Sequence, residues 1–312
     1  MRVLVTGGAG FIGSHLVERL LAEGHTVRVL DDFSTGRREN LAFAKPGAAL
    51  EVVEGDVRDP CAVREAVATV DGVFHEAALV SVPRSVEEPE LSCAINAHGT
   101  ARVFDAARRA GVRRVVFASS AAVYGDTAEV PVSERAAVRP LSPYGLDKLY
   151  TEQLAALHHA LYGQEALPLR YFNVFGPRQD PSSPYSGVIS IFVTRLLAGQ
   201  PITIHGDGEQ TRDFVYVADV VEANMRAMFG SYGGPSPLNV GGDGRMSLKT
   251  LAALLGEIVG TTPVITHGAA CAGDIRHSAA DITAIRAALG YVPRWTTHAG
   301  LAALVAAVRA ER

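Results

Sequence analysis

The 312-residue chain has little cysteine, little tryptophan and no concentrated charge. Its three cysteines lie far apart and form no C-x-x-C pair, which argues against a disulfide framework and against a zinc site. The formal net charge is −4 and no basic block occurs, so we do not expect a nucleic-acid partner. No apolar run approaches the roughly 20 residues of a membrane-spanning helix, so no membrane partner is expected. No metal site is predicted either, because the histidines lack metal-like spacing; they include His15, His25, His98, His158 and His159.

Apolar residues are abundant instead. They make up 48% of the chain, and charged residues make up 20%, which is typical of a soluble globular enzyme. The length suffices for one large domain or two coupled ones with an ample core. Because the chain begins directly with a strand pattern, we expect no signal peptide and a cytoplasmic location.

A glycine-rich turn follows the first predicted strand. The apolar run Val3–Val5 breaks into glycines, and an amphipathic helical pattern begins at Phe11. Gly7 permits a sharp turn, Gly10 lets the backbone approach a pyrophosphate, and Gly13 lets the helix lie close to the strand. Such a loop alone is also typical of a flexible turn. Its position at the end of the first strand favours a phosphate-binding turn, where helix N–H groups face the ligand.

Short apolar strands alternate with helical patterns up to about residue 171. The predicted strands are Arg2–Thr6, Thr26–Leu30, Leu50–Glu54, Gly72–His75, Arg114–Ala118 and Leu167–Tyr171. The predicted helices are Phe11–Glu23, Cys61–Thr69, Pro89–Ala110 and Pro143–Tyr162. This alternation predicts an α/β fold, a doubly wound parallel sheet of the Rossmann type. Later in the chain Gly and Pro become frequent. We therefore predict a Rossmann domain over residues 1–173 and a smaller C-terminal α/β substrate-binding lobe over residues 174–312, partly interleaved with the first.

Polar and small residues follow three of the predicted strands. Asp31 ends the second strand about 20 residues after the glycines, where a carboxylate can accept hydrogen bonds from a ribose diol. It would repel a 2′-phosphate, so residues 1–173 are predicted to bind NAD rather than NADP. Arg37-Arg38 could serve a phosphate, but they lie beyond the carboxylate and are expected to form a solvated face or a helix start. Asp56 either meets the adenine edge or caps its loop. Ala77-Ala78 are small enough to let a cofactor cross the strand ends.

A serine, a tyrosine and a lysine form the candidate catalytic group. Ser120 follows the fifth strand. Ser142 is a good N-cap and Pro143 suits the first helical position, so a helix starts there and places Tyr144 and Lys148 on one face. The ammonium, together with the positive charge of bound NAD, is expected to lower the pKa of Tyr144 and make it a proton acceptor and donor. Tyr-x-x-x-Lys is also common on ordinary amphipathic helices, but here it coincides with the glycine turn and the serines.

These residues resemble an extended short-chain dehydrogenase/reductase over essentially the whole chain, and within that family the NAD-dependent UDP-hexose 4-epimerases. The resemblance is carried by Thr6-Gly7-Gly8-Ala9-Gly10-Phe11-Ile12-Gly13, Asp31, Ser119-Ser120-Ala121, Tyr144-x-x-x-Lys148 and Arg170-Tyr171-Phe172-Asn173. It implies catalytic roles for Ser120, Tyr144 and Lys148. It also implies tightly held NAD, contacted by Gly7, Gly10, Phe11, Ile12, Gly13, Asp31, Asp32, Asp56, Val57, Ala77, Ala78, Asn96, Ser119, Tyr144 and Lys148. For Asn96 the alternative is a helix cap.

The residues after Ser120 separate branches of this family. Sugar-nucleotide 4,6-dehydratases carry an Asp-Glu pair there and glucuronate decarboxylases a Glu, whereas this chain has Ala121-Ala122. The resemblance thus implies a 4-epimerase, in which Tyr144 takes and returns the C4 hydroxyl proton while NAD takes and returns the C4 hydride. Other reactions stay open: a UDP-glucuronate 4-epimerase, or a TDP- or CDP-sugar epimerase, dehydratase or reductase. A catalytically silent NAD-sensing or scaffold protein is a further alternative.

The resemblance also implies contacts to a UDP-sugar. Asn173 resembles an asparagine that contacts the diphosphate, and Arg212 and Arg276 resemble phosphate-clamping arginines, although each alone is equally a surface arginine. Ser278 is small where epimerases restricted to glucose and galactose carry a bulky Tyr. We therefore expect turnover of UDP-glucose/UDP-galactose and of UDP-GlcNAc/UDP-GalNAc. The implied substrate contacts are Ser81, Arg84, Ser120, Tyr144, Asn173, Arg212, Arg276 and Ser278, with Arg84 a conceivable partner for a uronic acid.

Two long helical patterns, Pro89–Ala110 and Pro143–Tyr162, carry more apolar residues than one face requires. In the family these helices pair across a two-fold axis, so a homodimer is predicted.

Overall fold

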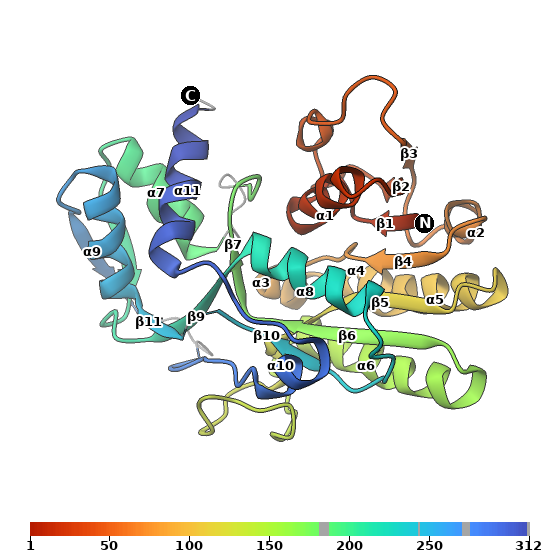
Figure 1. Cartoon of the computed structure of the whole chain (residues 1–312). Helices are drawn as coiled ribbons and strands as arrows, with labels where there is room; N and C mark the ends of the chain where they lie inside the picture. Colours follow the sequence, from red (N-terminus) through yellow and green to blue (C-terminus); the bar gives the residue numbers. More distant parts are fainter. Residues whose placement is uncertain (181–186, 243, 270–274, 311–312) are drawn as a thin grey trace.

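The computed structural model describes residues 1–180, 187–242, 244–269 and 275–310. Its larger part is built on a seven-stranded sheet in the order β10-β6-β5-β4-β1-β2-β3, and all neighbouring strands are parallel (Figure 1). The strands are β1 (Arg2–Thr6), β2 (Thr26–Asp31), β3 (Leu50–Glu54), β4 (Gly72–His75), β5 (Arg114–Ser120), β6 (Glu165–Tyr171) and β10 (Leu238–Val240). The predicted Rossmann-type α/β fold is therefore confirmed.

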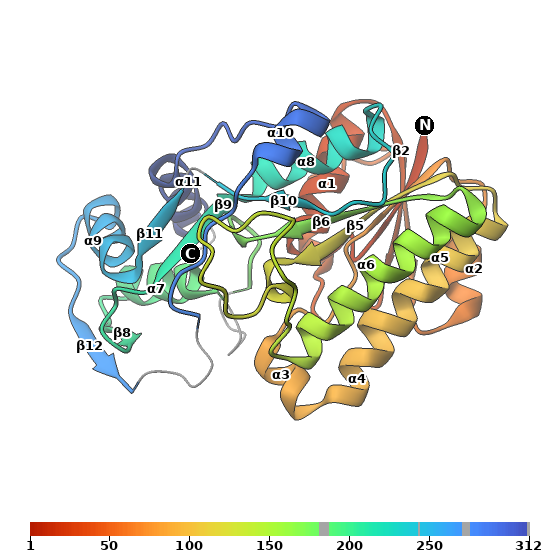
Figure 2. The same cartoon turned by 90° about the horizontal axis from the view of Figure 1, so that it is seen from below.

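Helices cover both faces of this sheet (Figure 2). They are α1 (Phe11–Ala22), α8 (Val217–Phe229) and α10 (Thr283–Leu289) on one face, and α2 (Pro60–Val67), α5 (Thr100–Arg109) and α6 (Pro143–Tyr162) on the other. Successive residues of β1 point into opposite layers: Val5 packs with Leu16 of α1, and Leu4 packs with Phe104 of α5. This burial on both faces explains why the strands are continuous apolar runs.

The order of the strands reverses beside β1, which pairs with β2 on one side and with β4 on the other. In open α/β sheets the ligand crevice lies outside the carboxyl ends of the strands at such a reversal. The glycine turn follows β1, so it lies at this point.

One predicted helix is wrong in detail. The pattern Pro89–Ala110 forms α4 (Pro89–Cys93), a π-helical turn η2 (Ala94–Gly99) and then α5, rather than one α-helix. The Asn96 side chain, inside the π turn, bonds both backbone groups of Leu79: Oδ1 accepts from the N–H at 2.8 Å, and Nδ2 donates to the carbonyl at 3.1 Å. This tertiary contact favours the wider turn. The other predicted elements have the predicted bounds or differ from them by at most two residues at an end.

The smaller part contains a three-stranded sheet and a two-stranded sheet (Figure 1). The strands are β7 (Asn173–Phe175), β9 (Thr211–Tyr216) and β11 (Arg245–Ser247), and β8 (Ile202–His205) with β12 (Ile265–Gly268). Helices α7 (Val188–Leu197), α9 (Leu248–Val259) and α11 (Thr297–Ala310) enclose its core. The remaining short elements are η1 (Arg38–Leu41), α3 (Val82–Glu87) and η3 (Ala121–Val123). The chain passes back into the larger sheet at β10. A division at residue 173 stays a prediction.

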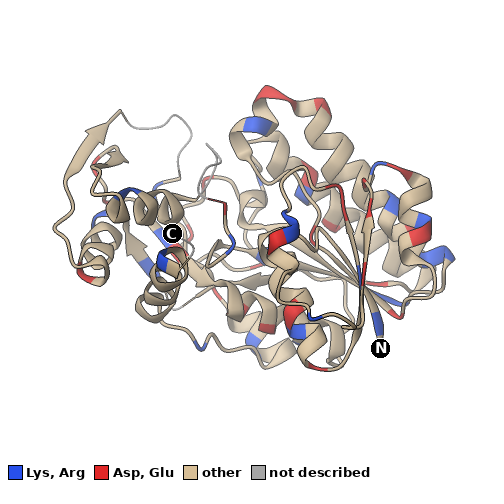
Figure 3. Ribbon diagram, turned by 90° about the horizontal axis from the view of Figure 1, so that it is seen from above, with Lys and Arg blue, Asp and Glu red and all other residues tan. Residues whose placement is uncertain are grey.

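Residues of both charge signs are interspersed along the ribbon (Figure 3). No helix among the described residues is long and apolar enough to cross a membrane. In the same part of the chain, no group of three or more His, Cys, Asp or Glu side chains is arranged to hold a metal ion. Cys61 and Cys93 are unbridged, and Cys271 lies outside the described residues.

Candidate functional site

The glycine turn after β1 is packed too tightly for side chains. Gly7 has a φ of +66°, and a Cβ there would lie 2.7 Å from the Ala77 nitrogen. A Cβ on Gly13 would lie 2.1 Å from the Gly7 carbonyl oxygen, and one on Gly10 would lie 3.1 Å from it. Gly10 is also the N-cap of α1 and makes no side-chain cap. The turn therefore brings bare backbone and the N-terminus of α1 to the sheet edge, as a pyrophosphate site requires.

Asp31 faces this turn from the end of β2. Its Oδ2 accepts from the Ala9 N–H at 2.8 Å and its Oδ1 accepts from the Phe33 N–H at 2.9 Å. Burial raises the pKa of Asp31, and the two N–H bonds oppose that rise. A carboxylate offers about four lone-pair sites, so two bonds leave acceptor capacity for a ribose diol. The next residue, Asp32, is exposed and accepts from the N–H and hydroxyl of Ser34.

Asp56 is a loop carboxylate paired with Arg58. Arg58 donates to it from its backbone N–H at 2.7 Å and from Nε at 2.8 Å, and the Arg58 side chain lowers the pKa of Asp56. The loop-capping alternative for Asp56 is thus observed, and an adenine contact stays a prediction. The neighbouring Val57 is buried, and Ala77 and Ala78 are half-buried at the end of β4.

Two of the side chains implied to contact the cofactor form hydrogen bonds to other residues of the protein instead. Asn96 is 1% exposed and is bonded to Leu79 as described above, which fits the structural alternative. The Ser119 hydroxyl is buried and donates to Glu152, which forms an ion pair with Arg170. The polar atoms of both side chains are therefore bonded within the polypeptide.

The candidate catalytic residues come together from β5 and α6. Ser120 is the last residue of β5, and Ser142 caps α6 by accepting from the Gly145 N–H at 3.1 Å, as predicted. Pro143 begins that helix, and Tyr144 and Lys148 follow within its first two turns. Lys148 Nζ donates to the Ala118 carbonyl at 2.8 Å and lies 5.8 Å from the centre of the Tyr144 ring.

Burial dominates the electrostatics of this group. Tyr144 and Lys148 are 7% and 5% exposed. Burial raises the pKa of Tyr144 to about 12, the Glu76 carboxylate adds to the rise, and a hydrogen bond from Ser120 opposes it. Burial also lowers the pKa of Lys148 to about 8. In the polypeptide alone the pKa of Tyr144 is therefore raised rather than lowered, because desolvation of the phenolate is the largest effect and Lys148 is not among the effects that lower it. The predicted effect of the positive charge of bound NAD stays a prediction.

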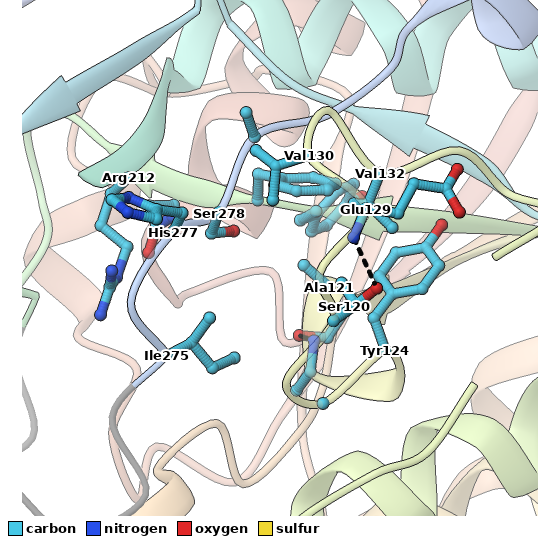
Figure 4. Close-up of a pocket in the computed structure, with 17 residues that line it drawn as sticks. Ser120, Ala121, Tyr124, Glu129, Val130, Val132, Arg212, Ile275, His277 and Ser278 are labelled. Carbon is cyan, nitrogen blue, oxygen red and sulfur yellow. Dashed lines mark hydrogen bonds between the residues drawn. The ribbon is translucent and has the colours of Figure 1, made fainter. Parts of the chain in front are cut away.

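A pocket of about 270 Å³ opens next to Ser120. Figure 4 shows Arg212, His277 and Ser278 on one side and Ser120 and Ala121 on the other. The complete lining is Ser120, Ala121, Ala122, Tyr124, Gly125, Thr127, Glu129, Val130, Val132, Tyr171, Phe172, Asn173, Arg212, Ile275, His277, Ser278 and Ala279. Both parts of the fold contribute to it.

The pocket brings together some predicted substrate contacts and leaves out others. Asn173, Arg212 and Ser278 line it together with Ser120. Arg276 does not line it: the residue is exposed, and both its terminal nitrogens donate to the Asp207 carboxylate at 2.8 Å.

Three other implied contacts also lie outside the lining: the buried Tyr144, Ser81 and Arg84. Ser81 caps α3 by accepting from the Arg84 N–H, and the Arg84 side chain pairs with Glu88 at 3.2 Å. Reasoning from sequence missed Thr127, Glu129, Val130 and His277, which do line the pocket. They lie on irregular segments where no periodic signal marks them.

Comparison with known proteins gives a consistent result. The NAD dependent epimerase/dehydratase family matches residues 3–241. The UDP-glucose 4-epimerase of Mycolicibacterium smegmatis is 42% identical over 307 residues, which cover 98% of this chain and 97% of that protein.

Two solved structures are similar over nearly their whole length. The UDP-N-acetylglucosamine 4-epimerase from Methanobrevibacter ruminantium M1, in complex with UDP-N-acetylmuramic acid, has a TM-score of 0.94 and 35% identity, covering 100% of this chain and 99% of that one. The UDP-glucose 4-epimerase from Thermotoga maritima, with UDP-glucose, has a TM-score of 0.94 and 36% identity over the same shares. The family match and these sequence identities agree with the geometry of the glycine turn and of Asp31. The chain therefore belongs to the NAD dependent epimerase/dehydratase family, and its cofactor is NAD.

Proposed function

We propose that the chain is a UDP-hexose 4-epimerase that works through a transient 4-keto sugar. The observation that carries the proposal is the pair formed by the buried Tyr144 and the half-buried Ser120, beside a pocket wall of Ala121 and Ala122. Methyl groups at these two positions supply no acid to eliminate water from a sugar. Among the lining residues that the structure describes, Glu129 is the one carboxylate, and it lies on the loop 125–132 rather than at the end of β5.

The cofactor site fits NAD. The bare backbone at Gly7, Gly10 and Gly13 would hold the pyrophosphate, and Asp31 would hold the adenosine ribose. Negative charge at Asp31 disfavours a 2′-phosphate. When bound, NAD supplies a reversible hydride acceptor for the sugar carbon.

The chain's own groups handle the proton. Ser120 orients the C4 hydroxyl, and Tyr144, as phenolate, takes its proton as the C4 hydrogen leaves as a hydride that bound NAD would accept and later return, leaving a ketone on the sugar. The Lys148 ammonium stabilises the anionic form of Tyr144. Tyr144 returns the proton to the C4 oxygen after the sugar has presented its other face. The product then differs from the substrate only in configuration, so its mass is unchanged.

The lining of the pocket supports a UDP-sugar as the substrate class. Arg212 lines it on the side opposite Ser120 (Figure 4), Asn173 also lines it, and Arg212 is suited to a diphosphate because its planar fork binds phosphate oxygens in pairs. Ser278 is small and leaves room for a 2-acetamido group. The enzyme therefore accepts UDP-glucose and UDP-GlcNAc, each with its galacto epimer.

The test is epimer formation by the NAD-loaded protein. Incubation with UDP-glucose, and separately with UDP-GlcNAc, should produce the C4 epimer, detected by proton NMR. Tyr144→Phe should lower the rate by about 10²–10⁴-fold, the usual contribution of a positioned acid–base group. Tyr232→Phe is the matched control, because that hydroxyl donates to the Ser236 carbonyl outside the pocket. Absence of both epimers, or full activity of the Tyr144 variant, would contradict the proposal.

We also propose a homodimer formed through α6 and the neighbouring helices. Leu146, Leu157 and Leu161 lie on one face of α6 and are 58%, 55% and 67% exposed. A second copy of this face would cover them. Light scattering at twice the 32.9 kDa chain mass would support the dimer, and a monomer at micromolar concentration would oppose it.

A further inference from the structure

Glu76 is an ionisable residue beside the catalytic group, and nothing above gives it a role. It follows β4 directly, and its backbone N–H donates to the Thr6 carbonyl at 3.1 Å, which holds it beside the glycine turn. Its half-buried carboxylate accepts from the Tyr171 hydroxyl at 2.9 Å, and the Tyr171 oxygen accepts from Asn224 Nδ2 at 2.7 Å. Tyr171 and Asn224 are 7% and 0% exposed, so buried hydrogen bonds fix the position of the carboxylate.

The strand register places Glu76 close to the catalytic lysine. β4 and β5 pair with His75 opposite Phe117, so Glu76 and Ala118 come next on adjacent strands. Such strands lie about 4.8 Å apart. Lys148 Nζ donates to the Ala118 carbonyl at 2.8 Å. The Lys148 ammonium therefore lies at the end of β5, the strand adjacent to the one that Glu76 follows. Little water reaches this site to screen the attraction between the ammonium and the Glu76 carboxylate.

We propose that Glu76 is a positioning residue of the epimerisation: its carboxylate, held by Tyr171, keeps Lys148 in the ammonium form around neutral pH. The inference rests on the function proposed above for Tyr144 and Lys148. Burial alone lowers the pKa of Lys148, and the Glu76 charge is the largest effect that raises it again. A neutral amine would not stabilise an anionic Tyr144. The Glu76 charge acts directly against that anion, so its contribution to proton transfer is to keep Lys148 charged.

The other charged groups around Lys148 are bonded to other residues or are neutral. Asp147 and Glu152, on its own helix, are held by buried hydrogen bonds and by a buried ion pair, respectively. His75 of β4 is kept neutral because burial lowers its pKa to about 3. Glu76 differs because burial raises its pKa to about 7, so its charge appears in the range in which Lys148 titrates.

The test is a direct titration of Lys148, which the sequence makes simple because the chain has only three lysines, Lys45, Lys148 and Lys249. The NAD-loaded protein is labelled with ¹³C-lysine, and Lys45→Arg and Lys249→Arg assign the side-chain signals. Glu76→Gln should lower the pKa of Lys148 by at least about half a unit, a threefold rise in its acid dissociation constant. The alkaline limb of the kcat profile should move to lower pH by the same amount.

Two further variants keep the test decisive. Glu134→Gln is the matched control: that carboxyl is half-buried, burial raises its pKa, and it is not among the charges acting on Lys148, so the Lys148 titration should not move. Tyr171→Phe removes the hydroxyl that stabilises the Glu76 charge, so it should also lower the Lys148 pKa. This variant tests the inference even if Glu76→Gln fails to fold. An unchanged Lys148 pKa in both Glu76→Gln and Tyr171→Phe would overturn the inference even in an active epimerase. A shifted pKa with no epimer formed would overturn the proposed function alone.

Discussion

Acid should destabilise this protein through one buried histidine. His75 is 3% exposed at the end of β4, with Nδ1 2.7 Å from the Thr6 hydroxyl oxygen and Nε2 2.9 Å from the Thr100 hydroxyl oxygen. The Thr100 hydroxyl donates to the Asn96 carbonyl, so it must accept from Nε2–H. Nδ1 is then the acceptor for Thr6. The ring is a neutral Nε2–H tautomer, and a second ring proton would face a donor.

The magnitude follows from the two states of the ring. Burial lowers the pKa of His75 to about 3, with the Lys148 charge adding to the effect. In the unfolded chain the pKa is about 6.5. Between these values the unfolded chain binds the extra proton, so the stabilising contribution is present above pH 6.5 and is lost as the pH falls toward 3. The limiting slope is about 1.4 kcal/mol per pH unit, and about 1.2 kcal/mol is lost between pH 6 and pH 5.

The assay is urea unfolding at pH 7, 6 and 5, at fixed NAD concentration, for the native chain and for His75→Gln. Glutamine is of similar size and does not titrate in this range. Other ionisable groups are shared by the two proteins, so the difference between the two slopes belongs to His75. The native chain should lose about 1.2 kcal/mol more than the variant from pH 6 to pH 5. Parallel losses would refute the argument, because they would mean that the ring gains no proton on unfolding.

Two further predictions concern packing and specificity. Arg170→Met leaves the Glu152 carboxylate, 6% exposed, without its partner and should lower the free energy of unfolding by about 3–5 kcal/mol, measured by urea denaturation with an unchanged m-value; a loss below 1 kcal/mol would contradict the role of the pair. Ser278→Tyr fills the pocket wall and should lower kcat/KM for UDP-GlcNAc at least tenfold relative to UDP-glucose, measured by NMR with each substrate; equal losses for both sugars would count against Ser278 as the selecting residue.

The sequence sufficed for most of the larger sheet because strands buried on both faces are continuous apolar runs with sharp ends. It missed β10, which is three residues long and lies among glycines and prolines. The pairing of Leu238 with Leu169 of β6 makes that segment a strand, and such pairing is a tertiary fact. The π turn was missed for the same reason, since the contact between Asn96 and Leu79 spans 17 positions.

Within the candidate site, residues adjoining regular elements were easier to predict than residues on loops. Ser120, Tyr144 and Lys148 are placed by a strand end and a capped helix, both visible as patterns. Arg276 matched a motif, yet its side chain pairs with Asp207 outside the pocket. Glu76 gave no signal at all, because a carboxylate after a strand becomes notable only when burial and a partner are known.

The acidity of Tyr144 shows most clearly what spacing cannot supply. A lysine one turn away suggests an acidic phenol, but burial acts on both groups and disfavours the charged form of each. With the pKa of Tyr144 at about 12 and that of Lys148 at about 8, the resting pair at neutral pH is a neutral phenol beside an ammonium. Forming the phenolate at pH 7 would cost roughly 7 kcal/mol, at about 1.4 kcal/mol per pKa unit. The hydrogen bond from Ser120 lowers this cost, whereas the Glu76 and Asp147 carboxylates add to it. The groups packed around the phenol therefore set its acidity, and the spacing of Tyr144 and Lys148 alone does not reveal them.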